Sequence, residues 1–130
     1  MKKYFNVART VSKTSQYPRI KIGCCIVKKN VVLAVGVNKY KSHPLQKKYN
    51  KFRSMDESHI HNNIHAELDA IIKCNRQDLI GASIYVYRED SFGNLRMCRP
   101  CEACRKLIRD SGIKEVYYTT GEGLCREVLL

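Results

Sequence analysis

The chain has 130 residues, 44% of them hydrophobic, and a formal net charge of +12 at pH 7. This length and composition suit one globular domain over residues 1–130 and exclude a low-complexity or repeat protein. No stretch approaches the roughly 18 apolar residues of a membrane span, and the N-terminus lacks the apolar core of a signal peptide. We therefore expect a cytoplasmic protein without membrane contact, whose seven cysteines stay reduced for metal binding or core packing.

The charge is distributed unevenly along the chain. Residues 1–55 contain fourteen Lys or Arg and no Asp or Glu, whereas residues 56–130 contain ten basic and twelve acidic residues. The acid-free half favours a phosphate-bearing partner, either a nucleotide or a nucleic acid. A generally basic surface without a specific ligand explains the same count equally well.

The first part of the chain predicts a helix followed by a hairpin. Apolar residues at helical spacing indicate a helix over about residues 2–14. Two β-rich runs, 20–27 and 31–37, predict two buried strands. Small residues in these strands would let helices pack closely against them, and they are Gly23, Cys24, Cys25, Ala34 and Gly36. We interpret the two cysteines among them as core thiols rather than metal ligands.

The middle of the chain combines a polar segment with a second helical pattern. Residues 39–62 are polar and basic, and we expect them to form a long loop. Apolar spacing from Ala66 to Cys74 predicts a helix that ends before Gly81, with Asn62 or Asn63 as its N-cap.

The remaining elements complete an alternation of helices and strands. We expect, in order, a strand over 82–90, a turn at 91–94 that returns through 95–98, a helix opened by Pro100 and ended before Gly112, a strand over 113–120 and a final strand over 124–130. This alternation predicts an α/β fold, specifically a three-layer α/β/α sandwich with a mixed sheet of about five strands.

A Cys-x-x-Cys pair, Cys101 and Cys104, lies at the expected start of the late helix. A redox pair is one interpretation, because a helix N-terminus stabilises a thiolate. However, the redox motif usually comes early in its domain. Cys98 adds a third thiol at the same spacing, so a histidine could complete a closed structural zinc site. The spacing of the cysteines leaves these alternatives open.

His65 and Glu67, at the start of the middle helix, favour a catalytic zinc site instead. A zinc enzyme needs three protein ligands, an open position for water and an unligated group that moves protons. His65, Cys101 and Cys104 supply three ligands for one zinc ion per chain, and two thiolates with a neutral imidazole leave that ion formally neutral. Near the helix N-terminus, Glu67 can point at the metal-bound water.

The stretches HAE at 65–67 and PCEAC at 100–104 match the His-x-Glu and Pro-Cys-x-x-Cys signature of zinc-dependent nucleobase deaminases. Over roughly residues 20–120 the chain resembles the cytidine and deoxycytidylate deaminase superfamily. The resemblance implies hydrolytic deamination of cytosine to uracil, with zinc-bound hydroxide attacking C4 and Glu67 as the proton shuttle. We also expect a homo-oligomer.

The resemblance extends to two expected substrate contacts. By position, the backbone at Ala66 would help to hold the base, and Asn38 would touch the sugar. A capping or turn role is a close alternative for Asn38.

A histidine as first ligand is more similar to the deoxycytidylate, tRNA-adenosine and polynucleotide-editing branches than to the free-cytidine branch. We expect a free pyrimidine nucleotide or nucleoside as substrate, with dCMP first. One alternative is cytosine or adenine in single-stranded DNA or RNA, bound by the basic and aromatic residues of 39–53. Another is a non-catalytic, zinc-stabilised binding module closed by Cys98.

Two features depart from the family pattern. Arg99 stands where Ser, Thr or Glu is common before Pro-Cys, and residues 88–98 would form an extra hairpin that could wall the substrate pocket. These features are where we expect substrate choice to be determined.

The other histidines have less specific interpretations. We expect His43 and His59 to be loop residues and His61 to have a loop or capping role. A second zinc site, built from His43 and His59 with Asp56 and Glu57 as in some deoxycytidylate deaminases, is the less favoured alternative.

Overall fold

A computed structural model of the chain describes residues 2–52 and 63–129. Its elements, in chain order, are α1 (Lys2–Ser12), β1 (Ile22–Lys28), β2 (Val31–Val37), α2 (Pro44–Asn50), α3 (Ala66–Ile72), α4 (Arg76–Leu79), β3 (Ser83–Arg88), α5 (Glu102–Asp110), β4 (Glu115–Thr120) and β5 (Gly123–Val128). Within these described ranges, no helix has the length and apolar character needed to cross a membrane.

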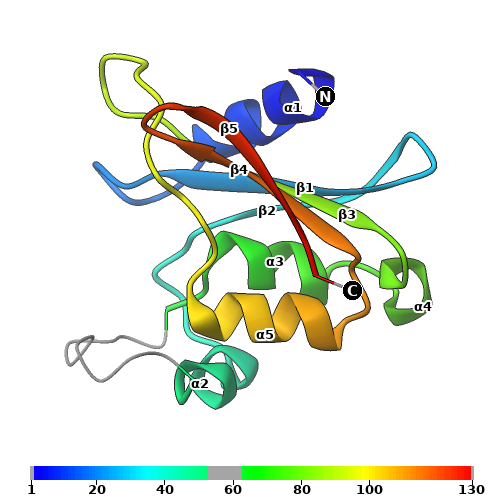
Figure 1. Cartoon of the computed structure of the whole chain (residues 1–130). Coiled ribbons are helices and arrows are strands. Elements are labelled where there is room, and N and C mark those ends of the chain that lie inside the picture. The colour runs from blue at the N-terminus through cyan, green and yellow to red at the C-terminus, as the bar shows by residue number, and fades with distance from the viewer. Residues whose placement is uncertain (1, 53–62, 130) are drawn as a thin grey trace.

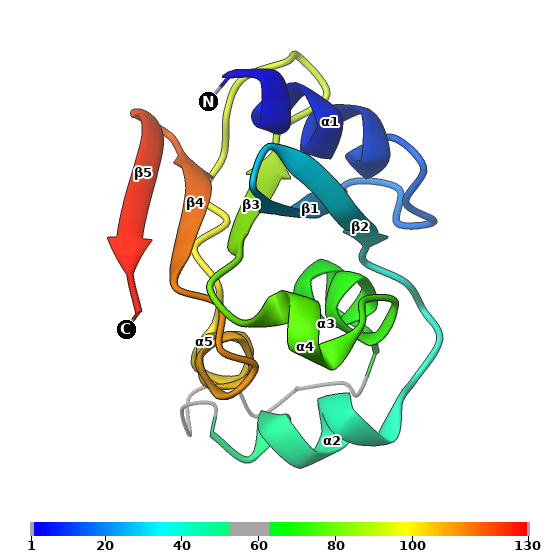
Figure 2. The same ribbon diagram turned by 90° about the vertical axis from the view of Figure 1, so that its right-hand side faces the viewer.

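The five strands form one mixed sheet in the order β2-β1-β3-β4-β5. β3 and β4 are parallel, and every other neighbouring pair is antiparallel. Figure 1 and Figure 2 show α1 on one face of the sheet, with α2, α3 and α5 on the other. The predicted three-layer α/β/α sandwich with a mixed five-stranded sheet is therefore confirmed.

β1 divides the core into two parts, because successive side chains of a strand point to opposite faces. Cys24 belongs to the larger cluster under α3 and α5, whereas Cys25 belongs to the smaller cluster under α1. Both thiols are fully buried, and they donate hydrogen bonds to the carbonyl oxygens of Ala66 and Tyr4 respectively, at 3.0 and 3.4 Å. Their interpretation as core thiols is confirmed.

The topology brings the starts of α3 and α5 to the same end of the sheet. β2 and β3 are both antiparallel to β1, which lies between them, so the chain leaves both strands at the same end. Residues 63–64 return beside 39–42, through a bridge between Ser42 and Asn63, so that α3 begins next to the end of β2. α5 connects the parallel strands β3 and β4 and begins after the end of β3, as a crossover must.

Two glycines allow helices to lie directly on the backbone of the sheet. A Cβ at Gly23 would collide with the Ala8 carbonyl oxygen and the Ser12 nitrogen of α1. A Cβ at Gly36 would collide in the same way with the Ala66 carbonyl oxygen and the Ala70 nitrogen of α3. The small residues of the hairpin therefore allow the close helix packing that the sequence predicts.

A buried carboxylate in the first turn of α3 ties this helix to the end of β2. Asp69 is 1% exposed, accepts a hydrogen bond from the Val37 N–H at 3.0 Å, and pairs with the ammonium groups of Lys39 and Lys73 at 3.0 Å each. Burial alone would raise the pKa of Asp69, but these donors outweigh burial and lower the pKa below its ordinary value.

The prediction of a loop throughout 39–62 is wrong, because Pro44 opens the helix α2. His43 caps it, with Nδ1 accepting a hydrogen bond from the Leu45 N–H at 3.1 Å. The buried residues of α2 are Gln46, Tyr49 and Asn50. Two of these three are polar, so hydrophobic periodicity could not reveal this helix.

Three smaller expectations also needed correction. His65, rather than Asn63, is the N-cap of α3, and Asn62 lies outside the described residues. The helix expected to end just before Gly81 ends at Ile72 instead, and the separate short helix α4 follows it. The hairpin at 88–98 has a tight turn in which Asp90 accepts hydrogen bonds from two backbone N–H groups, but only one β-bridge, between Glu89 and Leu95, links its arms.

The close contact at Gly36 leads to a prediction about stability. Gly36→Ala should lower the free energy of unfolding by about 1–3 kcal/mol, because the new methyl group forces α3 away from β2. Gly121→Ala is the matched control, since a Cβ at Gly121 meets no atom within 4 Å. Urea unfolding of the two variants tests this prediction, and equal stabilities would contradict it.

Candidate active site

Three side chains converge where α3 and α5 begin. The ligand atoms of His65, Cys101 and Cys104 all lie within 4.8 Å of one another. His65 Nδ1 is 3.2 Å from the Cys104 sulfur and 3.7 Å from the Cys101 sulfur. In a tetrahedral zinc site, bonds of about 2.0 Å to nitrogen and about 2.3 Å to sulfur place these atoms about 3.5 Å apart. The donor set and its spacing therefore fit one zinc ion.

Helix ends position these ligands. His65 and Cys101 are the N-cap residues of α3 and α5, and neither side chain caps its own helix. Cys104 is in the first turn of α5. The buried Gln46 of α2 accepts a hydrogen bond from the His65 N–H at 3.1 Å, so α2 fixes the backbone of the first ligand. Sequence reasoning missed Gln46, because α2 has no hydrophobic period and only Pro44 marks its start.

Glu67 lies beside the ligand group without belonging to it. Its side chain is buried, with 5% of the residue exposed, and it lies close to Cys104. Burial is the largest influence and raises the pKa of Glu67, although the nearby His65 acts in the opposite direction. A carboxyl group with a raised pKa is suited to carry a proton at neutral pH.

The two thiols have unequal acidity. The pKa of Cys101 is lowered, chiefly because the Cys104 thiol donates a hydrogen bond to it and also because His65 is close. The pKa of Cys104 is raised by donating that hydrogen bond and by burial. Cys101 therefore favours the thiolate, which is the form that binds metals.

Cys98 is directed away from the ligand group. Its sulfur donates to the Val86 carbonyl oxygen at 3.3 Å and lies 3.0 Å from the Thr119 hydroxyl, in the core between β3 and β4. A zinc site closed by Cys98 is thus not what the structure shows. Among residues 2–52 and 63–129, the cluster of possible metal ligands consists of His65, Cys101 and Cys104, and three protein ligands is the number that catalytic zinc sites use.

Arg99 forms an ion pair with Glu127 of β5, the last strand of the sheet. Its Nε lies 2.8 Å from Glu127 Oε1, and Arg105 Nη2 lies 3.5 Å from the other oxygen of the same carboxylate. Glu127 of β5 therefore holds the metal-binding segment on both sides of Cys101 and Cys104. This pairing gives Arg99 an anchoring role in the structure.

The two predicted substrate contacts, Ala66 and Asn38, are both buried and hydrogen-bonded within the fold. Ala66 is 1% exposed, and its carbonyl oxygen accepts a hydrogen bond from the Cys24 thiol. Asn38 holds the chain before β1: its Oδ1 accepts from the Ser15 hydroxyl at 2.6 Å and from the Ile22 N–H at 3.0 Å, and its Nδ2 donates to the Ile20 carbonyl oxygen at 2.7 Å. These bonds show the turn-stabilising role of Asn38, and contact with substrate stays a prediction for both residues.

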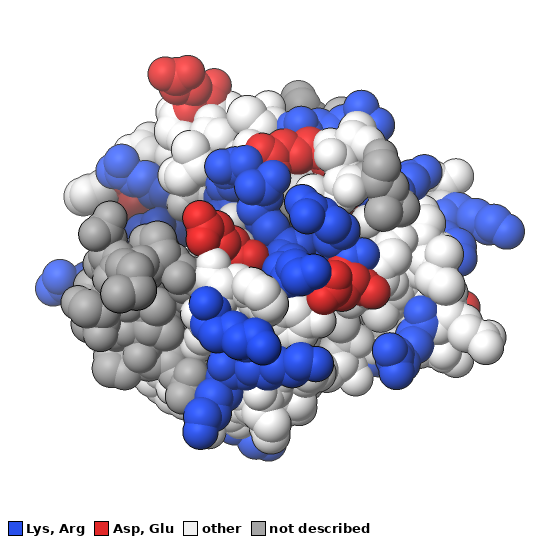
Figure 3. Space-filling view, turned by 60° about the horizontal axis from the view of Figure 1, so that its bottom comes forward, with Lys and Arg blue, Asp and Glu red and all other residues white. Residues whose placement is uncertain are grey.

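The basic and aromatic residues of 39–53 are partly used within the fold. Tyr49 is buried, and its hydroxyl donates to Asp110 at 2.9 Å. Phe52 has the ammonium groups of Lys51 and Lys106 at 5.3 and 5.8 Å from its ring centre. Figure 3 shows Lys and Arg side chains gathered on the face that carries α2 and α5, with acidic groups between them.

The histidine predictions can be assessed only in part. His43 caps α2, and its Nδ1 is used in that cap. His59, His61, Asp56 and Glu57 lie outside the described residues, as does the second zinc site that would include them.

Comparison with known proteins agrees with this geometry. Residues 1–120 match the model of the cytidine and deoxycytidylate deaminase zinc-binding region. The deoxycytidylate deaminase of Mycobacterium phage D29 is 47% identical over 55 residues, which cover 42% of this chain and 35% of the phage protein. The human deoxycytidylate deaminase is 30% identical over 120 residues, covering 88% of this chain and 61% of the human protein. The chain thus spans less than two thirds of the length of each of these two relatives.

Two solved structures resemble the fold. The dCMP deaminase of cyanophage S-TIM5 in its apo form has a TM-score of 0.63 and 25% identity, covering 90% of this chain and 79% of that chain. The cytidine deaminase of Burkholderia pseudomallei has a TM-score of 0.64 and covers 98% of this chain and 91% of that chain, and at 19% identity this likeness concerns the fold alone. Since the family model spans residues 1–120 and the fold agrees, this chain belongs to the cytidine and deoxycytidylate deaminase family.

Proposed function

We propose that this chain removes the amino group of cytosine by hydrolysis in a free pyrimidine nucleotide or nucleoside, with dCMP as the favoured substrate. The observation that carries the proposal is the convergence of His65 Nδ1 and two cysteine sulfurs beside the buried Glu67. The names of the relatives support the choice of dCMP, as does a structure of the cyanophage S-TIM5 enzyme in complex with dCMP and dUMP.

His65, Cys101 and Cys104 would hold a single zinc ion per chain, which when bound supplies a Lewis acid that makes water more acidic. Glu67 takes a proton from the attacking water as the oxygen adds to C4 of the base. It passes this proton to ring N3 and then moves the second water proton to the amino group. The C4–N bond breaks, so cytosine and water become uracil and ammonia.

Two residues complete the proposed binding of substrate. The backbone at Ala66, beside the first proposed metal ligand, would contact the base. Asn38 Nδ2 uses one of its two N–H groups to bond the Ile20 carbonyl oxygen, and the second N–H would donate to the sugar. The proposal includes a homo-oligomeric enzyme, a state that light scattering would measure.

Zinc-loaded protein should convert dCMP to dUMP, measured as the loss of cytosine absorbance. Glu67→Gln should lower kcat by about 10²–10⁴-fold while zinc stays bound, because the variant keeps the shape of the side chain but cannot carry the proton. Glu102→Gln, at an exposed position in the first turn of α5, is the matched control and should leave kcat unchanged. The proposed function is wrong if dCMP, dCTP, cytidine and deoxycytidine all remain intact, and the role of Glu67 is wrong if Glu67→Gln is fully active.

The position of Cys98 leads to a separate prediction about the metal site. Cys98→Ser should retain about one zinc ion per chain after dialysis against a chelator, because its sulfur bonds Val86 and Thr119 instead of the metal. Cys104→Ser should lose the ion under the same conditions. Equal zinc loss from both variants would support a closed structural site and contradict an open catalytic one.

A further inference from the structure

The ring nitrogen of His65 that faces the two cysteine sulfurs is Nδ1. Nδ1 is bonded directly to Cγ, whereas Nε2 lies on the far side of the ring. An ion held by Nδ1 therefore lies closer to the backbone than an ion held by Nε2 would. Because the ligand atom is so close to the main chain, a displacement of the His65 backbone displaces Nδ1 with it. The geometry of the ligand group thus depends on how the His65 backbone is held.

The backbone that leads into α3 changes its hydrogen-bonding partner at His65. Ile64 makes two backbone hydrogen bonds with the segment 39–41, at 2.9 and 3.0 Å. The next N–H along the chain, that of His65, donates instead to the side-chain oxygen of Gln46, at 3.1 Å. The His65 carbonyl oxygen accepts from the Asp69 N–H at 3.0 Å, as the first hydrogen bond of α3. Gln46 therefore holds the only backbone donor of the first ligand.

The Gln46 side chain is itself fixed in one orientation. It is 2% exposed, and its Nε2 donates to Asn50 Oδ1 at 2.9 Å, one turn further along α2. The nitrogen of a side-chain amide only donates and its oxygen only accepts. The bond to Asn50 therefore directs the Gln46 oxygen toward His65. Burial strengthens both hydrogen bonds, because water does not compete for these groups.

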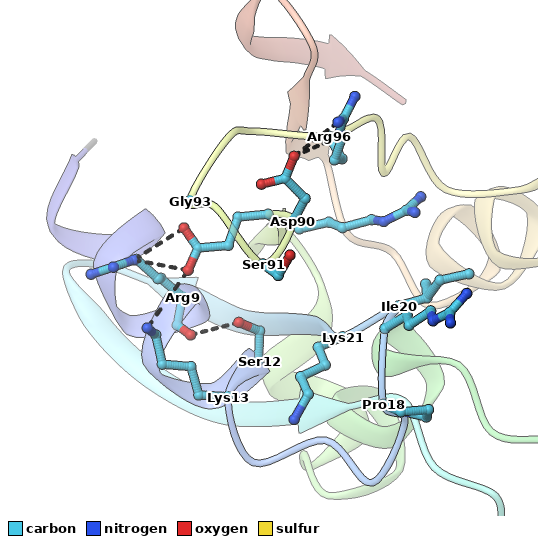
Figure 4. A pocket seen from close by; sticks show the side chains of 13 residues that line it. Arg9, Ser12, Lys13, Pro18, Ile20, Lys21, Asp90, Ser91, Gly93 and Arg96 are labelled. Carbon is cyan, nitrogen blue, oxygen red and sulfur yellow. Dashed lines mark hydrogen bonds and ion pairs between the residues drawn. The ribbon is translucent and has the colours of Figure 1, made fainter.

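Gln46 is placed to act on the site only through His65. A cavity of about 750 Å³ lies between the end of α1, residues 18–21 and residues 88–96 (Figure 4), and Gln46 is not among the residues that line it. Zinc sites in proteins use the side chains of Cys, His, Asp and Glu rather than the amide of Gln. An effect of Gln46 on the metal must therefore pass through the backbone of the first ligand.

We propose that Gln46 is a positioning residue of the metal site, whose side-chain oxygen sets where His65 Nδ1 lies relative to the two sulfurs. The inference rests on the zinc site of the proposed function, and it adds a residue that lies outside both HAE and PCEAC. Hydrogen bonds that orient the ligands of a metal typically change its affinity or activity by about 10–100-fold when they are removed.

The test measures how fast zinc leaves the loaded chain for a coloured chelator in excess. Gln46→Met keeps a side chain of similar size but has no strong acceptor, so zinc should leave at least about tenfold faster than from the wild type. Gln46→Glu keeps an acceptor oxygen and should stay within about threefold of the wild type. Wild-type rates for Gln46→Met, or equally raised rates for both variants, would overturn the proposal.

Tyr49→Phe is the matched control for a general loss of stability. It removes a hydrogen bond of the same helix, from the Tyr49 hydroxyl to Asp110 at 2.9 Å, at the end of α5 that lies away from the cysteines. Urea unfolding should show that both Tyr49→Phe and Gln46→Met are less stable than the wild type. Only Gln46→Met should lose zinc faster and change the absorption bands of bound Co²⁺. Equal zinc loss from the two variants would overturn a positioning role.

Hydrogen exchange of the zinc-free wild type tests the same contact without a substitution. The His65 N–H should exchange slowly, because Gln46 accepts its hydrogen bond inside the protein. Exchange at the rate of an unprotected amide would overturn the proposal.

Turnover of dCMP separates this inference from the proposed function. With zinc in excess, Gln46→Met should have a kcat at least about tenfold below the wild type, and Gln46→Glu should restore most of the loss. A wild type that binds zinc but deaminates no cytosine substrate would overturn the proposed function and leave the zinc-release result standing. An active wild type with unchanged zinc release and kcat in Gln46→Met would overturn the role of Gln46 alone.

Discussion

The close packing of α3 on the β1–β2 hairpin is the contact on which the candidate site depends. It is possible because Gly36 has no side chain, so the backbone of α3 rests directly on β2. The Cys24 thiol of β1 bonds the carbonyl oxygen of Ala66, and the buried Asp69 bonds the end of β2. These contacts fix the first turn of α3, which carries Glu67, and His65 directly before it.

The second half of the site comes from the parallel pair β3 and β4. Their connection must cross a face of the sheet, and α5 makes this crossing beside α3. Both helices begin at the same end of the sheet, so ligands from residues 65 and 101–104 meet there. Cys98 in the core and Arg99 and Arg105 on Glu127 then anchor the segment that carries the cysteines. The candidate site is thus positioned by the sheet and the two helices on it.

Sequence patterns predicted the sheet, its main helices and the ligand group, because these depend on local signals. Alternating β-rich runs, a proline that opens α5 and the residue spacing in HAE and PCEAC are readable one segment at a time. The prediction failed where the signal was tertiary. α2 buries two polar residues, Gln46 and Asn50. Gln46 accepts a hydrogen bond from the His65 N–H and donates one to Asn50. Buried polar residues leave no hydrophobic periodicity in the sequence, so the pattern did not indicate this helix. The partner of Arg99 lies in β5, 28 residues away, and no local pattern could indicate it.

The central claim is that the three ligands form an open zinc site rather than a closed one. Zinc K-edge X-ray absorption of the loaded protein measures this directly. We predict two sulfur ligands at about 2.3 Å and two nitrogen or oxygen ligands at about 2.0 Å, one from His65 and one from water. Three or more sulfur ligands would contradict the account, because a third thiol would occupy the position that a reacting water needs.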